Sequence, residues 1–393
     1  MDRAADDVVV VGAGLNGAAT SYFLLRQGVK NVTLIDAHQP GCGSSGSGVG
    51  LLRTHHDNLP ETELAAASMP YFRHWEEAIG GTCGWRPTGF LRFVGEDEVG
   101  ILKANIAYQH QLGVRAELLL PPDIARLQPH LAIDGIGAGV YEPDSGTADN
   151  LATLLSFLDA ATKMGLELVT DTPVLRVMTT DGVVAGVSTI ARDISAGCVV
   201  LATGSWTANL LKPLGVDLPI LGRAITVAEV ELSFDAPRLM SFMDPISDSW
   251  LSPVDLRTGY ISVRNQFTGS VVDPAVLDPY VDNDATREGI ERVSRRFPAL
   301  ADCSAKEMWT SHDSYVPDGK PVIGAVAGLS GLYLNTASAG KGHKVAPAVG
   351  EALARVISGA DLKTVDLTPF HPSRLAGLGF PSSGTEYKQR TIG

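Results

Sequence analysis

Cysteine is scarce in this sequence. The four cysteines, Cys42, Cys83, Cys198 and Cys303, are widely scattered, and they form neither a C-x-x-C pair nor a metal-like spacing with histidine. This usage indicates reduced thiols and gives no sign of a metal site. We therefore expect a cytoplasmic protein that holds no metal ion.

Long apolar runs and an excess of positive charge are also missing. No segment approaches the roughly 18 to 20 apolar residues that span a bilayer, and residues 1–7 lack the basic region of a signal peptide. With 31 Lys and Arg against 44 Asp and Glu, the net charge is −13, so the surface repels nucleic acid and anionic membranes. We expect no membrane span and no nucleic-acid partner, and a small anionic substrate needs a local basic cluster.

Length and composition are those of a globular chain with more than one core. At 393 residues the chain exceeds what one hydrophobic core usually supports, which favours two domains or one interleaved pair. The hydrophobic content of 45% and the charged content of 19% are ordinary for such proteins. No internal repeat or low-complexity tract is present.

The opening of the chain carries a glycine motif. Residues 8–11 are four valines that lead into Gly12, Gly14 and Gly17, and Asp36 closes a second apolar run. This pattern predicts a strand, turn and helix that bind a dinucleotide, with the pyrophosphate at the helix N-terminus and the carboxylate on the adenosine ribose. The acid favours FAD or NAD over NADP. An ordinary glycine-rich turn is the alternative, and the motif alone does not choose between FAD and NAD.

Two more segments are rich in small residues. Residues 41–50 follow the second strand directly, which suggests a loop laid against a flat ligand, although a linker is the alternative. Residues 198–204 are typical of a buried strand that ends in glycine, which lets the backbone approach a cofactor from a second side, with simple core as the alternative.

The distribution of strand-like and helix-like segments predicts an α/β fold, α+β overall. We expect a Rossmann-type dinucleotide-binding domain with a second, antiparallel-sheet substrate domain inserted twice. The first domain is assigned to residues 1–88, 146–220 and 315–375, the second to residues 89–145 and 221–314, and a tail to residues 376–393.

Three motifs occur together in a way that is characteristic of one family. They are the glycine motif, the run Ala-Thr-Gly-Ser-Trp at residues 202–206 and the run Pro-Asp-Gly-Lys-Pro-Val-Ile-Gly at residues 317–324. From about residue 7 to residue 360 the chain resembles the D-amino acid oxidase family of FAD-dependent oxidoreductases, nearest its sarcosine oxidase and dimethylglycine dehydrogenase branch. The resemblance implies that the first domain binds FAD.

The glycine motif and the resemblance together give a set of cofactor-binding candidates. They are Gly12, Gly14, Asn16, Gly17, Asp36, Ser44, Ser45, Gly50, Leu52, Val174, Ala202, Thr203, Gly204, Trp206, Gly340, Lys341, Gly342, His343 and Lys344.

The resemblance also implies a substrate site. Lys344 follows a glycine-rich segment similar to the one that closes over the flavin in sarcosine oxidases, and Arg53 stands where that branch places an arginine. Both are implied to bind the substrate carboxylate, and a guanidinium and an ammonium that converge in a dry pocket form a strong anion site. Further candidates for the pocket wall are His343, His312, Tyr260 and Trp309.

Two positions depart from monomeric sarcosine oxidase. Glu307 stands where that enzyme has the cysteine that carries its flavin, so we expect noncovalent FAD, with Cys303 and the pair His55 and His56 as alternative attachment points. Ile261 stands where it has the lysine that promotes reaction with oxygen, so the electron acceptor is left open between O2 and another carrier.

Taken together, these features predict an enzyme that oxidises the C–N bond of a small amino acid or N-alkyl amino acid to an imine, by hydride transfer to flavin N5. The alternatives are a flavin-dependent 2-hydroxy acid dehydrogenase, a noncatalytic FAD-binding subunit of a larger complex, and an NAD-linked dehydrogenase. The substrate side chain, the class of amine, and the choice between a homo-oligomer and a partner subunit stay open.

Overall fold

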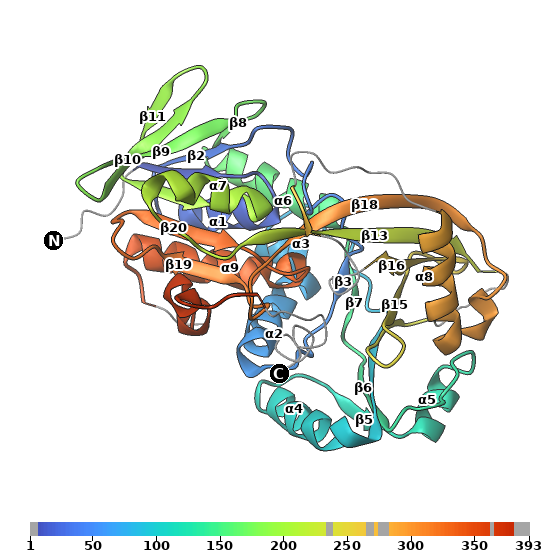
Figure 1. Cartoon of the computed structure of the whole chain (residues 1–393). Helices are drawn as coiled ribbons and strands as arrows, with labels where there is room; N and C mark the ends of the chain where they lie inside the picture. The colour runs from blue at the N-terminus through green and yellow to red at the C-terminus, as the bar shows by residue number, and fades with distance from the viewer. Residues whose placement is uncertain (1–6, 233–238, 265–270, 274–282, 362–364, 381–393) are drawn as a thin grey trace.

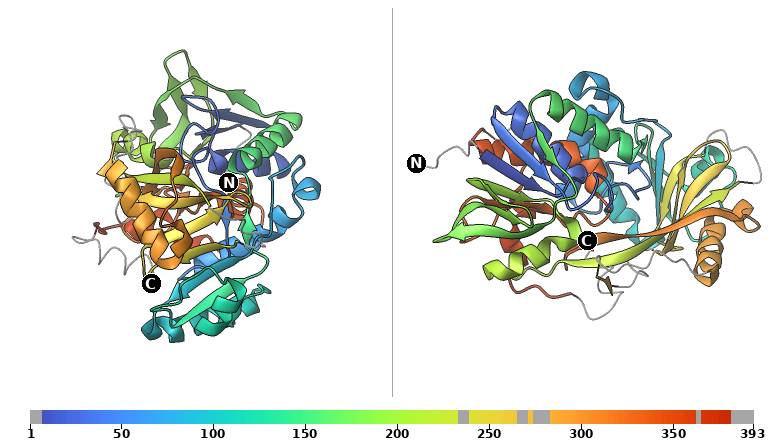
Figure 2. Two further views of the ribbon diagram at one scale, coloured as in Figure 1. Left: turned by 90° about the vertical axis from the view of Figure 1, so that its right-hand side faces the viewer. Right: turned by 90° about the horizontal axis from the view of Figure 1, so that it is seen from above.

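The computed structural model describes residues 7–232, 239–264, 271–273, 283–361 and 365–380. In this part of the chain a six-stranded and a nine-stranded sheet lie side by side, and a three-stranded and a two-stranded sheet accompany them (Figure 1). Two further views show the same division, with strands of the larger sheet extending away from the helix-covered one (Figure 2).

The six-stranded sheet has the first strand near its centre. All of its pairs are parallel except the pair at one edge, β19 with β20. Its spatial order is β19 (Val322–Ala325), β20 (Leu332–Thr336), β12 (Cys198–Leu201), β1 (Asp7–Val11), β2 (Asn31–Ile35) and β8 (Glu167–Val169).

Both faces of this sheet are covered, which explains the run of valines in β1. Val8 and Val10 pack against the helices on one face, whereas Val9 and Val11 pack against a three-stranded sheet and a short helix on the other. The helical layer contains α1 (Leu15–Arg26), α2 (Leu59–Arg73), α3 (Trp75–Ala78), α6 (Asn150–Lys163) and α9 (Gly342–Ser358). The opposite layer contains β9 (Val174–Thr180), β10 (Val183–Thr189), β11 (Asp193–Ser195) and α7 (Thr207–Leu211).

The nine-stranded sheet joins two separate parts of the chain. Its pairs are antiparallel except for β14 with β4, which run parallel and connect the two parts. The order is β17 (Val271–Val272), β13 (Leu221–Glu231), β16 (Thr258–Arg264), β15 (Ser249–Pro253), β14 (Ser241–Asp244), β4 (Phe90–Val94), β6 (Ala138–Glu142) and β5 (Glu117–Leu119), and β18 (Ala305–Tyr315) also pairs with β13.

A second hydrophobic core lies on this larger sheet. Phe93 and Phe242 contact each other there, and Phe297, which follows α8 (Asn283–Arg296), is fully buried in the same cluster. Two other helices, α4 (Val99–Gln111) and α5 (Pro121–Leu127), contact β6. A two-stranded sheet of β3 (Leu51–Leu52) and β7 (Gly146–Thr147) links chain segments of the two regions.

The mixed α/β architecture predicted from the sequence is confirmed. The strands of the six-stranded sheet fall within residues 1–88, 146–220 and 315–375, and the large sheet draws on residues 89–145 and 221–315. The domain boundaries themselves stay a prediction, and residues 381–393 of the predicted tail lie outside the described residues. None of the helices in the described ranges is long and apolar enough to cross a bilayer.

Candidate active site

A cavity of about 760 Å³ lies between the two large sheets. One wall is formed by the turns that follow the carboxyl ends of β1, β12 and β20, which is where open parallel sheets bind ligands. The other wall comes from the large sheet and includes the apolar residues Ile225, Val227, Met243, Trp250 and Trp309.

The glycine motif shapes the first wall. Gly12 has a φ of +105°, and a Cβ at this position would lie 2.6 Å from the Ala202 carbonyl oxygen. A Cβ on Gly17 would lie 1.9 Å from the Gly12 oxygen, so the third glycine allows α1 to pack on the turn. Gly14 lines the cavity itself, and the backbone there is bare toward the cavity.

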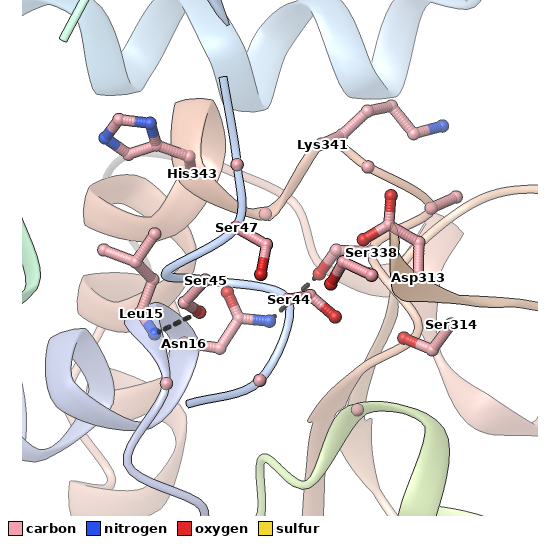
Figure 3. Close-up of a pocket in the computed structure, with 18 of the residues that line it drawn as sticks. Leu15, Asn16, Ser44, Ser45, Ser47, Asp313, Ser314, Ser338, Lys341 and His343 are labelled. Carbon is pink, nitrogen blue, oxygen red and sulfur yellow. Dashed lines mark hydrogen bonds between the residues drawn. The ribbon is translucent and has the colours of Figure 1, made fainter. Parts of the chain in front are cut away.

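The N-terminus of α1 opens onto this wall, as Figure 3 shows. The Leu15 N–H donates to Ser45 Oγ at 3.0 Å, and Asn16 Nδ2 donates to Ser338 Oγ at 3.0 Å. These bonds fix the loop of residues 41–50 and the loop before α9 against the helix end. An N-terminal helix end with hydroxyls around it is suited to an anion such as a pyrophosphate.

Asp36 lies at the end of β2 and borders the cavity. One carboxylate oxygen accepts from the Ala13 N–H at 2.6 Å, and the other accepts from the His38 N–H at 2.8 Å. The backbone therefore holds the carboxylate in place, and its remaining lone pairs are available for ribose hydroxyls.

Two buried cations line the inner part of the cavity. Arg53 is 7% exposed, its Nη1 has no hydrogen-bond partner among the described residues, and its guanidinium carbon lies 5.7 Å from the centre of the Phe90 ring. Burial, with the neighbouring charge of Arg92, lowers the pKa of Arg53 to about 10. Arg53 therefore stays charged at neutral pH. Among the described residues it forms no ion pair, although the charges of Asp57, Glu142 and Glu61 oppose the fall of its pKa.

Lys344 stands in the first turn of α9, where its Nζ donates to the Gly340 oxygen at 3.2 Å. Burial, with the charges of Arg53 and Lys341, lowers the pKa of Lys344 to about 7, and the charges of Asp313 and Glu61 oppose this shift. Because the first turn of α9 contains no acidic residue, the helix dipole adds to the positive potential there. Arg53 and Lys344 together make this end of the cavity an anion site.

These features fit FAD. The bare glycine backbone and the end of α1 suit the pyrophosphate, and the held carboxylate of Asp36 suits the ribose. The sequence profile of the family described as FAD dependent oxidoreductase matches residues 7–356. The chain belongs to this family. The protein is therefore an enzyme, and FAD is its cofactor.

Relatives of this FAD-dependent oxidoreductase include amino acid oxidases and dehydrogenases. The mitochondrial sarcosine dehydrogenase of Homo sapiens is 26% identical over 385 residues, which are 93% of this chain but 42% of the human protein. The glycine oxidase of Pseudomonas aeruginosa is 27% identical over 93% of this chain and 98% of its own length. The crystal structure of L-proline dehydrogenase from P. horikoshii matches with a TM-score of 0.85 and 23% identity, covering 95% of this chain and 99% of that chain. The chain thus spans less than half of the human relative.

Most of the predicted site residues of this oxidoreductase border the cavity. The ones that do are Gly12, Gly14, Asn16, Asp36, Ser44, Ser45, Gly50, Arg53, Val174, Ala202, Thr203, Gly204, Trp206, Trp309, Gly340, Lys341, Gly342, His343 and Lys344.

Four predicted residues do not line the cavity. Gly17 packs under the turn, and Leu52 is fully buried in the helix-side core. Tyr260 lies behind Trp309, with 5.3 Å between the ring centres. His312 points to the other face of β18, where its ring contacts Trp206 and its Nδ1 shares a hydrogen bond with Ser205 Oγ. These four residues therefore lie behind or beside the cavity wall, and their functional roles stay predictions.

His343 borders the cavity, but its ring points into the hydrophobic core. Its Nε2 pairs with Thr153 Oγ1 at 3.0 Å, and the ring meets Phe72 edge-on. Burial, with the charge of Lys344, lowers the pKa of His343 to about 3, so the ring is neutral. Figure 3 shows it on the opposite side of the cavity-lining loop from Asp313.

The two departures from monomeric sarcosine oxidase also have definite places. Glu307 is exposed on β18 and does not border the cavity. Ile261 is fully buried in the second hydrophobic core and does not border the cavity either, so its apolar side chain carries no information about charge next to the cofactor. The electron acceptor therefore stays open between O2 and another carrier.

Several polar residues of the wall were not predicted. They include Arg92 of β4, which pairs with Asp57 at 2.8 Å, and Glu61, which pairs with the predicted Lys341 at 2.5 Å. Asp313 also borders the cavity, on the strand face that it shares with Trp309. The sequence contained a signal for Asp313, because side chains at every second position of a strand share a face and Asp313 lies four residues after Trp309. No comparable signal marks Arg92 or Asp57, because tertiary packing alone brings them to Arg53.

Proposed function

We propose that the protein oxidises the C–N bond of a small amino acid or N-alkyl amino acid to an imine. The observation that carries the proposal is the charged Arg53 guanidinium, which is buried in the cavity wall near Lys344 with its Nη1 unpaired among the described residues. A substrate carboxylate would neutralise these cations, and paired donors would fix its orientation.

FAD supplies the two-electron acceptor for a hydride when it is bound. The residues that would hold it are Asp36 on the ribose, the α1 N-terminus with Ser44 and Ser45 on the pyrophosphate, and the Gly340–Lys344 segment near the ring system. Arg53 and Lys344 would bind the substrate carboxylate, and the apolar residues of the large sheet would exclude water from the reacting carbon. The substrate nitrogen must lose its proton before its lone pair assists the oxidation.

Anaerobic mixing of the purified flavoprotein with a panel of substrates tests this proposal. We expect amino acids or N-methyl amino acids to bleach the flavin absorbance, whereas 2-hydroxy acids of the same size leave it unchanged. Bleaching by the hydroxy acids alone supports the 2-hydroxy acid dehydrogenase. Bleaching by dithionite alone supports a noncatalytic FAD-binding subunit.

We also propose three finer properties. A cytoplasmic location is supported by the four cysteines, all of which are free thiols. Noncovalent FAD is supported by Glu307, since a carboxylate offers no thiol to which the flavin could attach. The electron acceptor is O2 or another carrier, and the rate at which the bleached flavin recovers in air or with a quinone distinguishes the two. Size-exclusion chromatography of the holoenzyme distinguishes a homo-oligomer from a chain that needs a partner subunit.

A further inference from the structure

Asp313 is a carboxylate in the cavity wall that the proposed mechanism does not use. It lies on β18, two residues beyond Ser311 and four beyond Trp309, and all three border the cavity. In the described part of the chain, no hydrogen bond or ion pair reaches the Asp313 carboxylate. A carboxylate in such surroundings is costly to keep charged unless a cation or a donor joins it.

The surroundings of Asp313 place it next to the anion site. A Cβ on Gly340 would lie 3.1 Å from Asp313 Oδ2, so the carboxylate lies against the Gly340 backbone. The carbonyl oxygen of the same Gly340 accepts from Lys344 Nζ at 3.2 Å. Lys344 in turn feels the charges of both Arg53 and Asp313. The cavity wall therefore presents Arg53, Lys344 and Asp313 in one neighbourhood, with cations and an anion beside each other.

The other charged groups around Asp313 leave this arrangement intact. Lys344 of α9 is the charged residue that acts on the Asp313 carboxylate. Lys341 is paired with Glu61. Arg223 lies opposite Asp313 in the register of β13 and does not border the cavity. Burial raises the pKa of Asp313 to about 6, and Lys344 opposes that rise. At neutral pH the group is thus mostly a carboxylate.

We propose that Asp313 is the counter-ion of the substrate's positively charged nitrogen, so that the site selects zwitterionic amino acids over carboxylates of the same shape without a cation. This inference rests on the proposed function and narrows it to a class of substrate. The carboxylate of a zwitterion would meet Arg53 and Lys344, while its ammonium group, a few bond lengths away, would meet Asp313. A 2-hydroxy acid offers Asp313 a neutral hydroxyl donor, which is a weaker partner than an ammonium.

The test compares two ligands of the same shape. N,N-dimethylglycine carries a cationic nitrogen where 3-methylbutanoate carries a CH group. Each is mixed anaerobically with the holoenzyme at pH 7.5, and the Kd comes from the shift of the oxidised flavin spectrum or, where the flavin bleaches, from the saturation of the bleaching rate. For Asp313→Asn we expect the Kd of dimethylglycine to rise about 10- to 100-fold and the Kd of 3-methylbutanoate to stay equal or fall.

A matched control removes a charge from the same strand. Glu307→Gln lies on β18 but is exposed and outside the cavity, so it should leave both Kd values unchanged. The wild-type protein gives a second measurement that needs no variant. Its preference for dimethylglycine over 3-methylbutanoate should shrink as the pH falls from 7 to 5, because Asp313 takes up a proton.

Two results overturn the inference. One is a wild-type protein that binds dimethylglycine no better than 3-methylbutanoate, and the other is an Asp313→Asn variant that changes both Kd values by the same factor or changes neither. Failure of the proposed function gives a different result: the holoenzyme binds these ligands, but no amino acid bleaches its flavin.

Discussion

Lys344 and Arg53 are positioned at some energetic cost. Each is buried, the charge of Arg53 lowers the pKa of Lys344, and Lys344 also lies at the positive end of the α9 dipole. Folding gains nothing from placing two like charges together in a poorly solvated wall. An arrangement that is unfavourable in the free protein and favourable with a bound anion is typical of a ligand site.

The shape of the Arg53 head group should matter as well as its charge. Arg53→Lys keeps the charge but replaces a planar fork by a point charge that cannot donate two parallel hydrogen bonds. We expect the Kd of propionate, measured from the flavin spectrum, to rise about tenfold or more. The exposed Arg115→Lys is the control, since its pair with Asp144 is on the surface. Equal Kd values for Arg53→Lys and wild type would remove Arg53 from the carboxylate site.

Carboxylate affinity should also depend on pH through Lys344. Its pKa in the free protein is about 7, and a bound anion prefers the charged form, so affinity is full below this pH and is lost as the pH rises through it. The charges that face Lys344 are those of Arg53, Lys341, Asp313 and Glu61. In the Asp313→Asn background, which removes the second titration, we expect the Kd of propionate to rise up to tenfold per unit above pH 7. Lys344→Met should abolish the slope, and a slope that persists there would assign it to another group.

At this scale the sequence predicted the residues that a motif marks and missed those that packing delivers. Arg53 and Lys344 follow glycine-rich segments with a recognisable pattern, and the structure places both in the cavity wall. Arg92 reaches the same wall from β4, a segment in which nothing in the sequence suggested a chemical role. Its position depends on the parallel pairing of β4 with β14, between residues about 150 positions apart, which local patterns do not encode.

At the scale of elements, the turn between β1 and α1 is the best-determined unit. The valine run, the glycine spacing and the helix-compatible residues all favour the same local structure, and the observed strand begins one residue before the valine run. Tyr260 shows where such reasoning fails. Its strand was predicted, but its cross-strand partner Glu229 and its place behind Trp309 depend on a register that is fixed by the whole sheet.

Two substitutions should separate folding from cofactor binding in this turn. Gly17→Ala places a Cβ 1.9 Å from a backbone oxygen, which no side-chain movement relieves, so we expect a loss of about 1–3 kcal/mol or more and a lower unfolding temperature. A Cβ in Gly14→Ala would lie 3.0 Å from the Ser45 hydroxyl, a side chain that can turn away, so the flavin-free protein should unfold near the wild-type temperature but retain less FAD.

Thermal unfolding of the flavin-free proteins and the flavin content of the purified ones measure these effects. Gly100→Ala is the control, because a Cβ there meets nothing within 4 Å and the residue lies within α4. Equal unfolding temperatures for Gly17→Ala and Gly14→Ala would contradict the separation.

At the scale of the whole molecule, the two large sheets share the cavity, and hydrogen bonds beside it connect them. Trp309 of the large sheet donates from Nε1 to the Ser47 oxygen at 3.0 Å, and Ser44 donates to the His312 oxygen. A ligand that fills this cavity contacts both sheets at once and binds the folded state alone. Its presence should therefore be visible in the stability of the entire chain.

Removal of FAD should lower the unfolding temperature by an amount that depends on the FAD concentration. With free FAD at about 1,000 times its Kd, the stabilisation is about 4 kcal/mol. Differential scanning fluorimetry of flavin-free protein with increasing FAD measures it. Acid precipitation of the holoenzyme should leave all the yellow colour in the supernatant, and colour that stays in the pellet would show a covalent bond.

The interleaving of the two regions has a consequence for biogenesis. Contacts such as Asn16 with Ser338 require chain segments that a ribosome makes far apart in time. At about 5–20 residues per second, roughly 20 to 70 s pass between the synthesis of the glycine turn and that of Lys344. FAD can therefore load only after translation of this stretch is finished, so riboflavin starvation should leave completed chains without FAD and should not change the nascent ones.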